Sequence, residues 1–177
     1  MTVQIVHLSN LPTLLIDIAA WGIIHAGTGY LAHRIPAERL VQETWLTKPR
    51  RIERQGQLYE QLRIRSWKDR LPEAGDVFEG GVSKRHLAGR DHQQLVAFAV
   101  ETRRAEIGHW LAAISSPVFL LWNRWPIAIV MMVYGFGVNA PFIAIQRYNR
   151  LRIARVLARW PLTLIRNERG TTGNNIP

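Results

Sequence analysis

The sequence predicts an all-α membrane protein with about three transmembrane helices and a cytoplasmic amphipathic or loop segment between the first and the second. Two apolar stretches, 11–32 and 127–145, have about the length that a helix needs to cross a bilayer. The chain also carries a net charge of +10 together with 47% hydrophobic residues. Because soluble nucleic-acid binders do not carry such long apolar runs, this combination favours the anionic inner leaflet of a membrane as partner and excludes nucleic acid.

The first apolar stretch, 11–32, carries one polar stripe at helical spacing. Ionisable groups in a membrane helix usually face other helices, because lipid offers them no hydrogen-bonding partner. We therefore expect Asp17 and His25 to make buried hydrogen bonds inside a bundle rather than to take part in chemistry. The members of the stripe are Asp17, Trp21, His25 and Thr28.

Basic residues are distributed asymmetrically along the chain. No Lys or Arg precedes Leu11, whereas residues 34–104 hold fifteen of them. Because positively charged segments remain on the cytoplasmic side, the N-terminus is predicted outside and the segment 33–106 inside. Cysteine is absent, which excludes disulfides, a thiolate nucleophile and a cysteine-ligated metal site.

The second half of the chain is predicted to form a membrane hairpin. Residues 107–122 are apolar but short, so this segment either spans the membrane with its ends snorkelling or is re-entrant. The stretch 127–145 is the strongest candidate span, and the basic segment 146–177 after it is predicted to be cytoplasmic. The whole chain, 1–177, is therefore expected to form a single membrane-embedded domain.

Residues 57–70 are predicted to form a basic amphipathic helix. Ile64, Trp67 and Leu71 fall on one stripe of it. A basic helix with an interfacial Trp lies on a membrane surface, and a charged solvent-exposed face is the alternative explanation of the same pattern. The basic residues of this helix are Arg63, Arg65, Lys68 and Arg70.

Residues 91–110 form a predicted helix whose inward face ends in two ionisable side chains. Glu106 and His109 are spaced i, i+3, so the carboxylate can hold the imidazole in one tautomer. Ionisable groups at the edge of lipid are costly and usually mark a functional site. The alternative is a helix end whose Glu and His only reach the headgroups. The same face carries Leu95, Phe98, Ala99 and Thr102 in the preceding turns.

A proline lies near the end of the last predicted span. Pro141 removes a backbone donor and is expected to bend the helix. The bend would turn the following string, residues 146–150, towards the site, and a plain helix end with arginine anchors is the alternative.

The strings 101–110, 139–141 and 146–152 together resemble the glycosyl-4,4'-diaponeurosporenoate acyltransferases. These are small bacterial membrane proteins of the staphyloxanthin type of carotenoid pathway. The resemblance covers roughly residues 30 to 155. This sequence departs from the family pattern in its longer loop around 72–81 and in the Pro-Phe after Asn139-Ala. The matching strings are Glu101-Thr-Arg-Arg-Ala-Glu106-x-x-His109-Trp110, Asn139-Ala-Pro141 and Gln146-Arg-Tyr-Asn-Arg-x-Arg152, with Trp67-Lys68, Arg85-His86-Leu87 and Arg34-Ile35-Pro36.

The resemblance implies transfer of a fatty acyl group onto a hydroxyl of a glycosylated carotenoid or a related glycolipid. It also implies a bacterial inner-membrane location, a lipid-like acceptor and contact with other enzymes of the pathway. No cofactor is expected, since acyl-CoA or an acyl carrier protein would supply the acyl group as co-substrate. The resemblance implies substrate-binding roles for Trp67, Lys68, Glu101, Arg103, Arg104, Asn139, Gln146, Arg147, Tyr148, Asn149 and Arg150.

Acyl transfer to a hydroxyl needs a base and donors that stabilise the oxyanion. His109 is the expected base and Glu106 its orienting partner, while Arg103 or Arg147 is expected to face the oxyanion or a phosphate of the acyl donor. No Ser stands in a recognisable nucleophile setting, which favours direct attack by the acceptor.

Three alternatives accompany this reading. His86 and Asp91 have the His-x4-Asp spacing of glycerolipid acyltransferases, although a loop with a helix cap explains them more simply. The pair Glu106 and His109 matches half of a di-iron site, but the chain has no second such pair, so no metal is expected. The third alternative is a non-catalytic membrane partner of a lipid or carotenoid pathway.

The predicted topology has three spans, with the N-terminus outside and the C-terminus in the cytoplasm. In this cysteine-free chain, Glu60→Cys and Ile165→Cys are expected to react with a thiol reagent only after the cytoplasmic side is made accessible. Labelling of both positions by an impermeant reagent in intact cells would contradict the topology.

Overall fold

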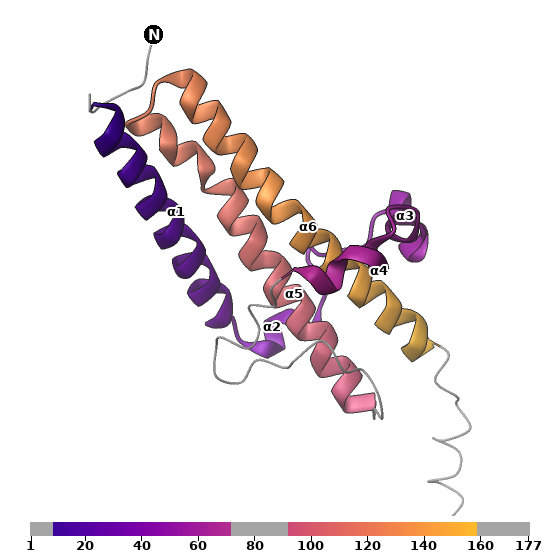
Figure 1. Ribbon diagram of the computed structural model, residues 1–177. Helices are drawn as coiled ribbons and strands as arrows, with labels where there is room; N and C mark the ends of the chain where they lie inside the picture. The colour runs from indigo at the N-terminus through magenta and orange to yellow at the C-terminus, as the bar shows by residue number, and fades with distance from the viewer. Residues whose placement is uncertain (1–8, 72–91, 159–177) are drawn as a thin grey trace, which may run out of the picture.

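The computed structural model describes residues 9–71 and 92–158, and all regular elements in these ranges are helices. Three long helices lie side by side and alternate in direction, with α5 between α1 and α6 (Figure 1). A 3₁₀ helix, η4, continues α5 towards the turn into α6. The bounds are α1 Asn10–His33, α2 Ala37–Val41, η1 Arg51–Gly56, α3 Gln57–Gln61, α4 Ile64–Trp67, η2 Lys68–Arg70, α5 His92–Ile114, η4 Ser116–Leu121 and α6 Trp125–Ala158.

Two of the long helices, α1 and α6, are long and apolar enough to cross a membrane. The predicted spans 11–32 and 127–145 lie inside them, although α6 continues for thirteen residues beyond 145 into the basic string. The predicted third span, 107–122, is not a helix of its own. Its first half is the end of α5, and Pro117, which cannot donate a backbone hydrogen bond, lies at the start of η4.

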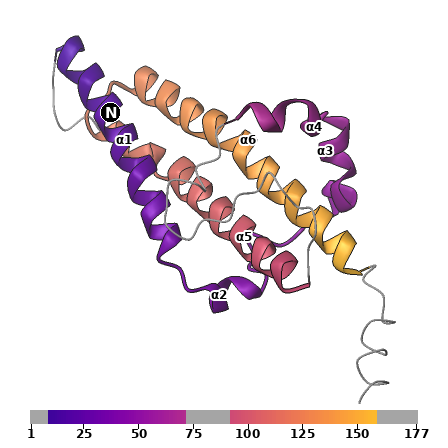
Figure 2. The same cartoon turned by 60° about the horizontal axis from the view of Figure 1, so that its bottom comes forward.

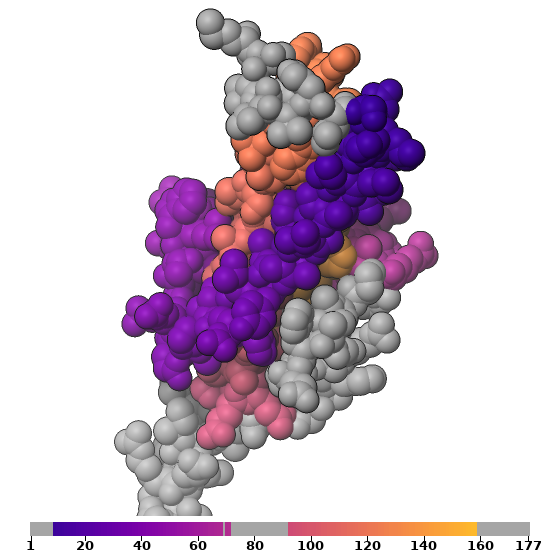
Figure 3. All heavy atoms as spheres, turned by 90° about the vertical axis from the view of Figure 1, so that its left-hand side faces the viewer, coloured from indigo at the N-terminus to yellow at the C-terminus, as the bar shows by residue number. Residues whose placement is uncertain are grey.

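The inward stripe of α1 is confirmed. Asp17, Trp21 and Thr28 are buried, and α1 runs across one face of the bundle (Figure 3). The Asp17 carboxylate accepts hydrogen bonds from Trp122 Nε1 at 2.8 Å and Asn123 Nδ2 at 2.7 Å. This carboxylate therefore ties α1 to the turn between η4 and α6, which is the structural role that its position predicts.

The prediction of one continuous amphipathic helix over residues 57–70 is wrong. The backbone leaves the helix at Arg63, whose φ of 51° is left-handed, and three short helices replace one long one. In a continuous helix Tyr59 and Ile64 would point about 140° apart. The break lets both side chains pack against Tyr148 and Leu151 of α6, so that α3 and α4 lie along α6 (Figure 2). Of the predicted stripe, Ile64 is therefore buried against α6, Trp67 packs partly against the same cluster and Leu71 is half-buried.

At Gly135, α6 lies close against side chains of α1 and η4. A Cβ atom added at Gly135 would lie 2.5 Å from Trp21 Cη2 and 3.0 Å from Ser116 Cβ. Trp21 has little room to move, because it is 7% exposed and stacks on Phe119 with ring centroids 4.9 Å apart. Only glycine fits this position without displacing the indole.

We expect Gly135→Ala to lower the stability of the bundle by about 1–3 kcal/mol, because the added methyl group overpacks this contact. Thermal unfolding of the detergent-solubilised protein measures the effect. Gly137→Ala is the matched control on the same helix, since an added Cβ there meets nothing within 4 Å. Equal melting temperatures for the two variants would contradict this account of the packing.

Candidate functional site

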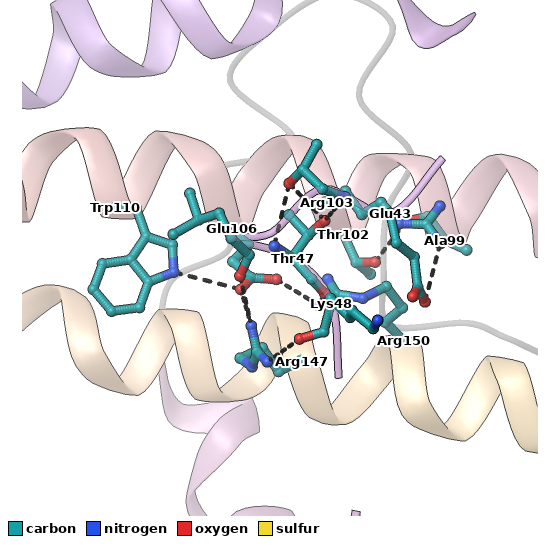
Figure 4. A network of polar contacts seen from close by, with 12 residues as sticks. Glu43, Thr47, Lys48, Ala99, Thr102, Arg103, Glu106, Trp110, Arg147 and Arg150 are labelled. Carbon is teal, nitrogen blue, oxygen red and sulfur yellow. Dashed lines mark hydrogen bonds and ion pairs between the residues drawn. The ribbon is translucent and has the colours of Figure 1, made fainter. Parts of the chain in front are cut away.

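The helices α5 and α6 enclose a buried charge network centred on Glu106. The side chains that α6 presents to it, Arg147 and Arg150, are spaced i, i+3 and so share one face. Arg147 Nη1 lies 2.5 Å from Glu106 Oε1, and Arg150 Nη2 lies 2.6 Å from Glu106 Oε2. Figure 4 shows these side chains pointing towards one another, with Trp110 Nε1 3.4 Å from the same carboxylate. Glu106 is fully buried, so its charge depends on these arginines.

A second buried carboxylate, Glu53 of η1, completes the network. Arg147 donates to it from Nε at 2.6 Å and from Nη2 at 3.0 Å. The Tyr59 hydroxyl and the Arg50 backbone amide also donate to this carboxylate. Burial by itself would raise the pKa of Glu53, but the hydrogen bonds from Arg147, Tyr59 and Arg50 outweigh it and hold the pKa below its usual range. Glu53 therefore remains charged and joins η1 to α6.

The arginines of α6 also satisfy the backbone of the segment before η1. Residues 42–50 contain no regular helix, so their carbonyl groups need partners from elsewhere. Arg147 donates to the carbonyls of Leu46 at 3.1 Å and Lys48 at 2.9 Å, and Arg150 donates to that of Thr47 at 2.7 Å. These contacts draw a segment about one hundred residues distant in sequence onto α6.

Two arginines of α5 act similarly on the preceding segment. Arg104 Nη1 donates to the carbonyls of Ala32 at 3.1 Å and His33 at 2.8 Å, and so caps the end of α1. Its Nε atom is held by Glu101 at 3.1 Å. Arg103 Nη1 donates to the carbonyls of Leu40 and Val41 at the end of α2. The charged string of α5 thus positions the chain between α1 and η1.

His109 lies one turn beyond Glu106 on α5, beside α6. Its Nδ1 atom is 2.9 Å from Asn139 Oδ1, and its ring stacks on Phe142 with centroids 4.7 Å apart. Asn139 Nδ2 donates to the Gly135 carbonyl at 2.8 Å, which fixes the orientation of the amide. Because an amide oxygen only accepts, Nδ1 of His109 donates this hydrogen bond, so in the neutral ring the lone pair is on Nε2. This is the tautomer of a general base that acts through Nε2.

The predicted site residues therefore fall into two neighbouring groups. Glu106, Arg147 and Arg150 form the charge network, and His109 and Asn139 form a separate hydrogen-bonded pair. The role of Glu106 as the orienting partner of His109 stays a prediction, while Asn139 makes the observed bond to Nδ1. The remaining predicted binding residues lie around these groups: Tyr148, Gln146 and Asn149 are buried in α6, Trp67 Nε1 donates to the Leu62 carbonyl, and Lys68 is half-buried in η2.

Sequence reasoning missed Glu53 and Tyr59. The only local signal is one acidic residue among the basic residues 50–54, and nothing in that pattern identifies a partner in α6. His86 and Asp91 lie outside the described residues. Within residues 9–71 and 92–158, no three His, Cys, Asp or Glu side chains gather as a metal site requires.

We expect Glu53→Gln to lower the free energy of unfolding by about 1–3 kcal/mol, because Arg147 loses a buried charged acceptor. The pKa of Glu53 in the folded protein lies below that of an unfolded Glu, about 4.3. Its stabilisation is therefore complete above that value and is lost as the pH falls through the folded-state pKa.

Unfolding measured between about pH 6 and pH 3 should thus show a shallower loss of stability in Glu53→Gln than in the unsubstituted chain. Glu60→Gln is the control, since the Glu60 side chain is 38% exposed and its ion pairs are 3.4 Å long. The same pH dependence in both variants would contradict the role assigned to Glu53.

Comparison with known proteins identifies the family. A sequence model described as glycosyl-4,4'-diaponeurosporenoate acyltransferase matches residues 42–159. Proteins of that name from Staphylococcus aureus strains USA300 and NCTC 8325 / PS 47 are each 27% identical over 140 residues, covering 77% of this chain and 83% of the relative. No solved structure matches the chain. Because the family match covers more than half of its length, the chain belongs to the glycosyl-4,4'-diaponeurosporenoate acyltransferase family and is an acyltransferase.

Proposed function

We propose that this protein transfers a fatty acyl group onto a hydroxyl of a glycosylated carotenoid or a related glycolipid, with His109 as general base. The observation that carries the proposal is the hydrogen bond from His109 Nδ1 to Asn139 Oδ1. It leaves Nε2 as the basic atom, and stacking on Phe142 restrains the ring plane. The base then removes the proton of the acceptor hydroxyl as its oxygen attacks the acyl carbonyl. The bond between the acyl carbon and the donor's leaving group breaks as the tetrahedral intermediate collapses, and the imidazolium returns the proton to that leaving group.

The surroundings of His109 suit a reaction between two lipid-like substrates. The ring is half-buried between helices whose outer surfaces are apolar and exposed. Ile129, Val130 and Val133 of α6 and Ile18 and Ile23 of α1 are among these exposed side chains. An acyl chain dissolved in the membrane would therefore have an apolar surface of the bundle to lie against.

Glu106 is proposed to assist His109 through its charge. It lies at i, i+3 on the same helix, and a carboxylate at that distance favours the imidazolium that forms when the base takes a proton. The two arginines on Glu106 hold the carboxylate in place. Its contribution should be smaller than that of His109, because it does not touch the transferred proton.

The proposed setting is a bacterial inner membrane, with the basic segments on the cytoplasmic side. The charge distribution supports this orientation. Anionic lipid, the glycosylated acceptor and other enzymes of the pathway are the proposed partners, and acyl-CoA or an acyl carrier protein is the proposed acyl donor. Expression of the chain with a glycosylated carotenoid and mass spectrometry of the lipid extract would detect the acylated product.

We expect His109→Ala to lower the rate of acyl transfer by about 10²- to 10⁴-fold, because it removes the base. Glu106→Gln should lower the rate of acyl transfer by a smaller factor. The rate losses of the two substitutions should be strongly non-additive in the double variant, because the two residues are proposed to act as one unit. The measurement is product formation by purified protein in nanodiscs, with the melting temperature as a check on folding.

His86→Ala is the control and should be mild. If His86→Ala is inactive while His109→Ala retains activity, the His-x4-Asp alternative is correct. If no variant and no unsubstituted protein forms product from any acyl donor offered, the non-catalytic partner is the better description.

A further inference from the structure

The charge network leaves three arginine nitrogens without partners among the described residues. They are Nε and Nη1 of Arg150 and Nε of Arg103, and all three atoms are buried. Arg150 is only 4% exposed. Glu106 Oε2, which lies 2.6 Å from Arg150 Nη2, is also buried without a hydrogen bond of good geometry. Buried N–H donors that make no hydrogen bond are costly, more so on a charged group, and the three arginine nitrogens have no acceptor among the described residues.

The same end of the network also carries an excess of positive charge. Its buried or nearly buried arginines are Arg103, Arg147 and Arg150, whereas its buried carboxylates are Glu53 and Glu106; the third carboxylate, Glu43, is 43% exposed, so the excess is one of buried charge. Burial, and after it the neighbouring Arg150 guanidinium, lower the pKa of Arg103, as expected for two cations that share one region. One further negative charge would balance the cluster.

Arg147 differs from the other two arginines in having all its nitrogens engaged. Its Nε, Nη1 and Nη2 atoms donate to Glu53, Glu106 and the carbonyls of Leu46 and Lys48. Arg147 therefore has no N–H group left to bind an additional anion, although the sequence made it a leading candidate for binding a phosphate of the acyl donor. The unused donors belong to Arg103 and Arg150, which face the segment containing Thr47 from opposite helices (Figure 4).

We propose that Arg103 and Arg150 form a binding site for a phosphate group. Three donor nitrogens on two guanidinium planes suit a tetrahedral anion with several oxygens better than a planar carboxylate. Glu43 stands at the edge of this site, 3.9 Å from Arg103 Nη2, and its side chain is 43% exposed. It is a weakly held acceptor that an incoming phosphate can displace.

The position of the site gives the phosphate a role in acyl transfer, an assignment that rests on the proposed function. Arg103 precedes His109 by six residues on α5, a rise of about 9 Å along the helix. Arg150 lies beyond Phe142 on α6 in the same direction, towards the basic end of the chain. A phosphate-bearing acyl donor held there would extend its acyl group towards the base. The phosphate belongs either to a soluble donor such as coenzyme A or to a phospholipid.

The test is the affinity of the purified full chain in detergent micelles for inorganic phosphate, measured by calorimetry with chloride as the ionic-strength control. We expect Arg150→Lys and Arg103→Lys each to weaken phosphate binding about 10-fold or more, because lysine keeps the charge but lacks the fork of donors. Arg147→Lys is the matched control. The Arg147→Lys substitution should lower the melting temperature. The folded fraction of this variant should bind phosphate with an affinity within about twofold of that of the unsubstituted chain.

Glu43→Gln keeps the test decisive if the arginine variants fail to fold. This exposed side chain competes with phosphate for Arg103, so its neutral replacement should bind phosphate about 3- to 10-fold more tightly. Phosphate binding no stronger than that of chloride, or equal losses in Arg147→Lys and Arg150→Lys, would overturn the proposal. So would unchanged affinity in Glu43→Gln.

Two competitors then identify the source of the phosphate. Displacement of inorganic phosphate by coenzyme A supports a soluble donor, whereas displacement by phosphatidylglycerol in the micelle supports a lipid. Either result supports the site. Phosphate binding is measured without acyl transfer, so the two proposals are tested separately. The phosphate site can be wrong while acyl transfer is observed, and acyl transfer can be absent while phosphate binds.

Discussion

The buried ion pairs between Glu106, Arg147 and Glu53 are the interaction on which the rest of the structure depends. Removing such charges from water costs several kcal/mol per ion, and only close geometry with further hydrogen bonds offsets the cost. Here one guanidinium bridges two carboxylates, at 2.5 Å and 2.6 Å, from α5 and η1. Because the three groups come from three distant parts of the chain, the network forms only when η1, α5 and α6 are assembled.

The sequence predicts that the charged residues 101–104 of α5 bind substrate, but in the structure they hold other parts of the chain in place. Arg103 and Arg104 hold the segment between α1 and η1 through backbone carbonyls, and Glu106 fastens α6. This arrangement supplies partners to irregular backbone next to a membrane, where unsatisfied carbonyl groups are costly. His109 lies about one turn from this cluster on α5.

Asn139 links helix packing to chemistry. Its amide is anchored to the Gly135 carbonyl, and Gly135 lies close against Trp21. The tautomer of His109 is consequently determined by the same contact that brings α6 against α1. A hydrogen bond from an anchored amide can define which nitrogen is basic, although it does not supply the negative charge of a carboxylate partner. The carboxylate one turn away, that of Glu106, is paired with Arg147 and Arg150.

The sequence by itself determined the helical class, two of the spans and the inward faces of α1 and α5, because apolar periodicity and length report directly on local structure and burial. It also identified His109, Glu106 and the arginine string. Only the tertiary structure decided which of these residues meet. The partner of His109 is thirty residues away, and that of Glu53 is ninety-four. The break at Arg63 likewise depends on α6, since Tyr59 and Ile64 face it together only when the helix is interrupted. The periodicity of a sequence carries no information on which distant residues come into contact, because these contacts are determined by how the three helices pack.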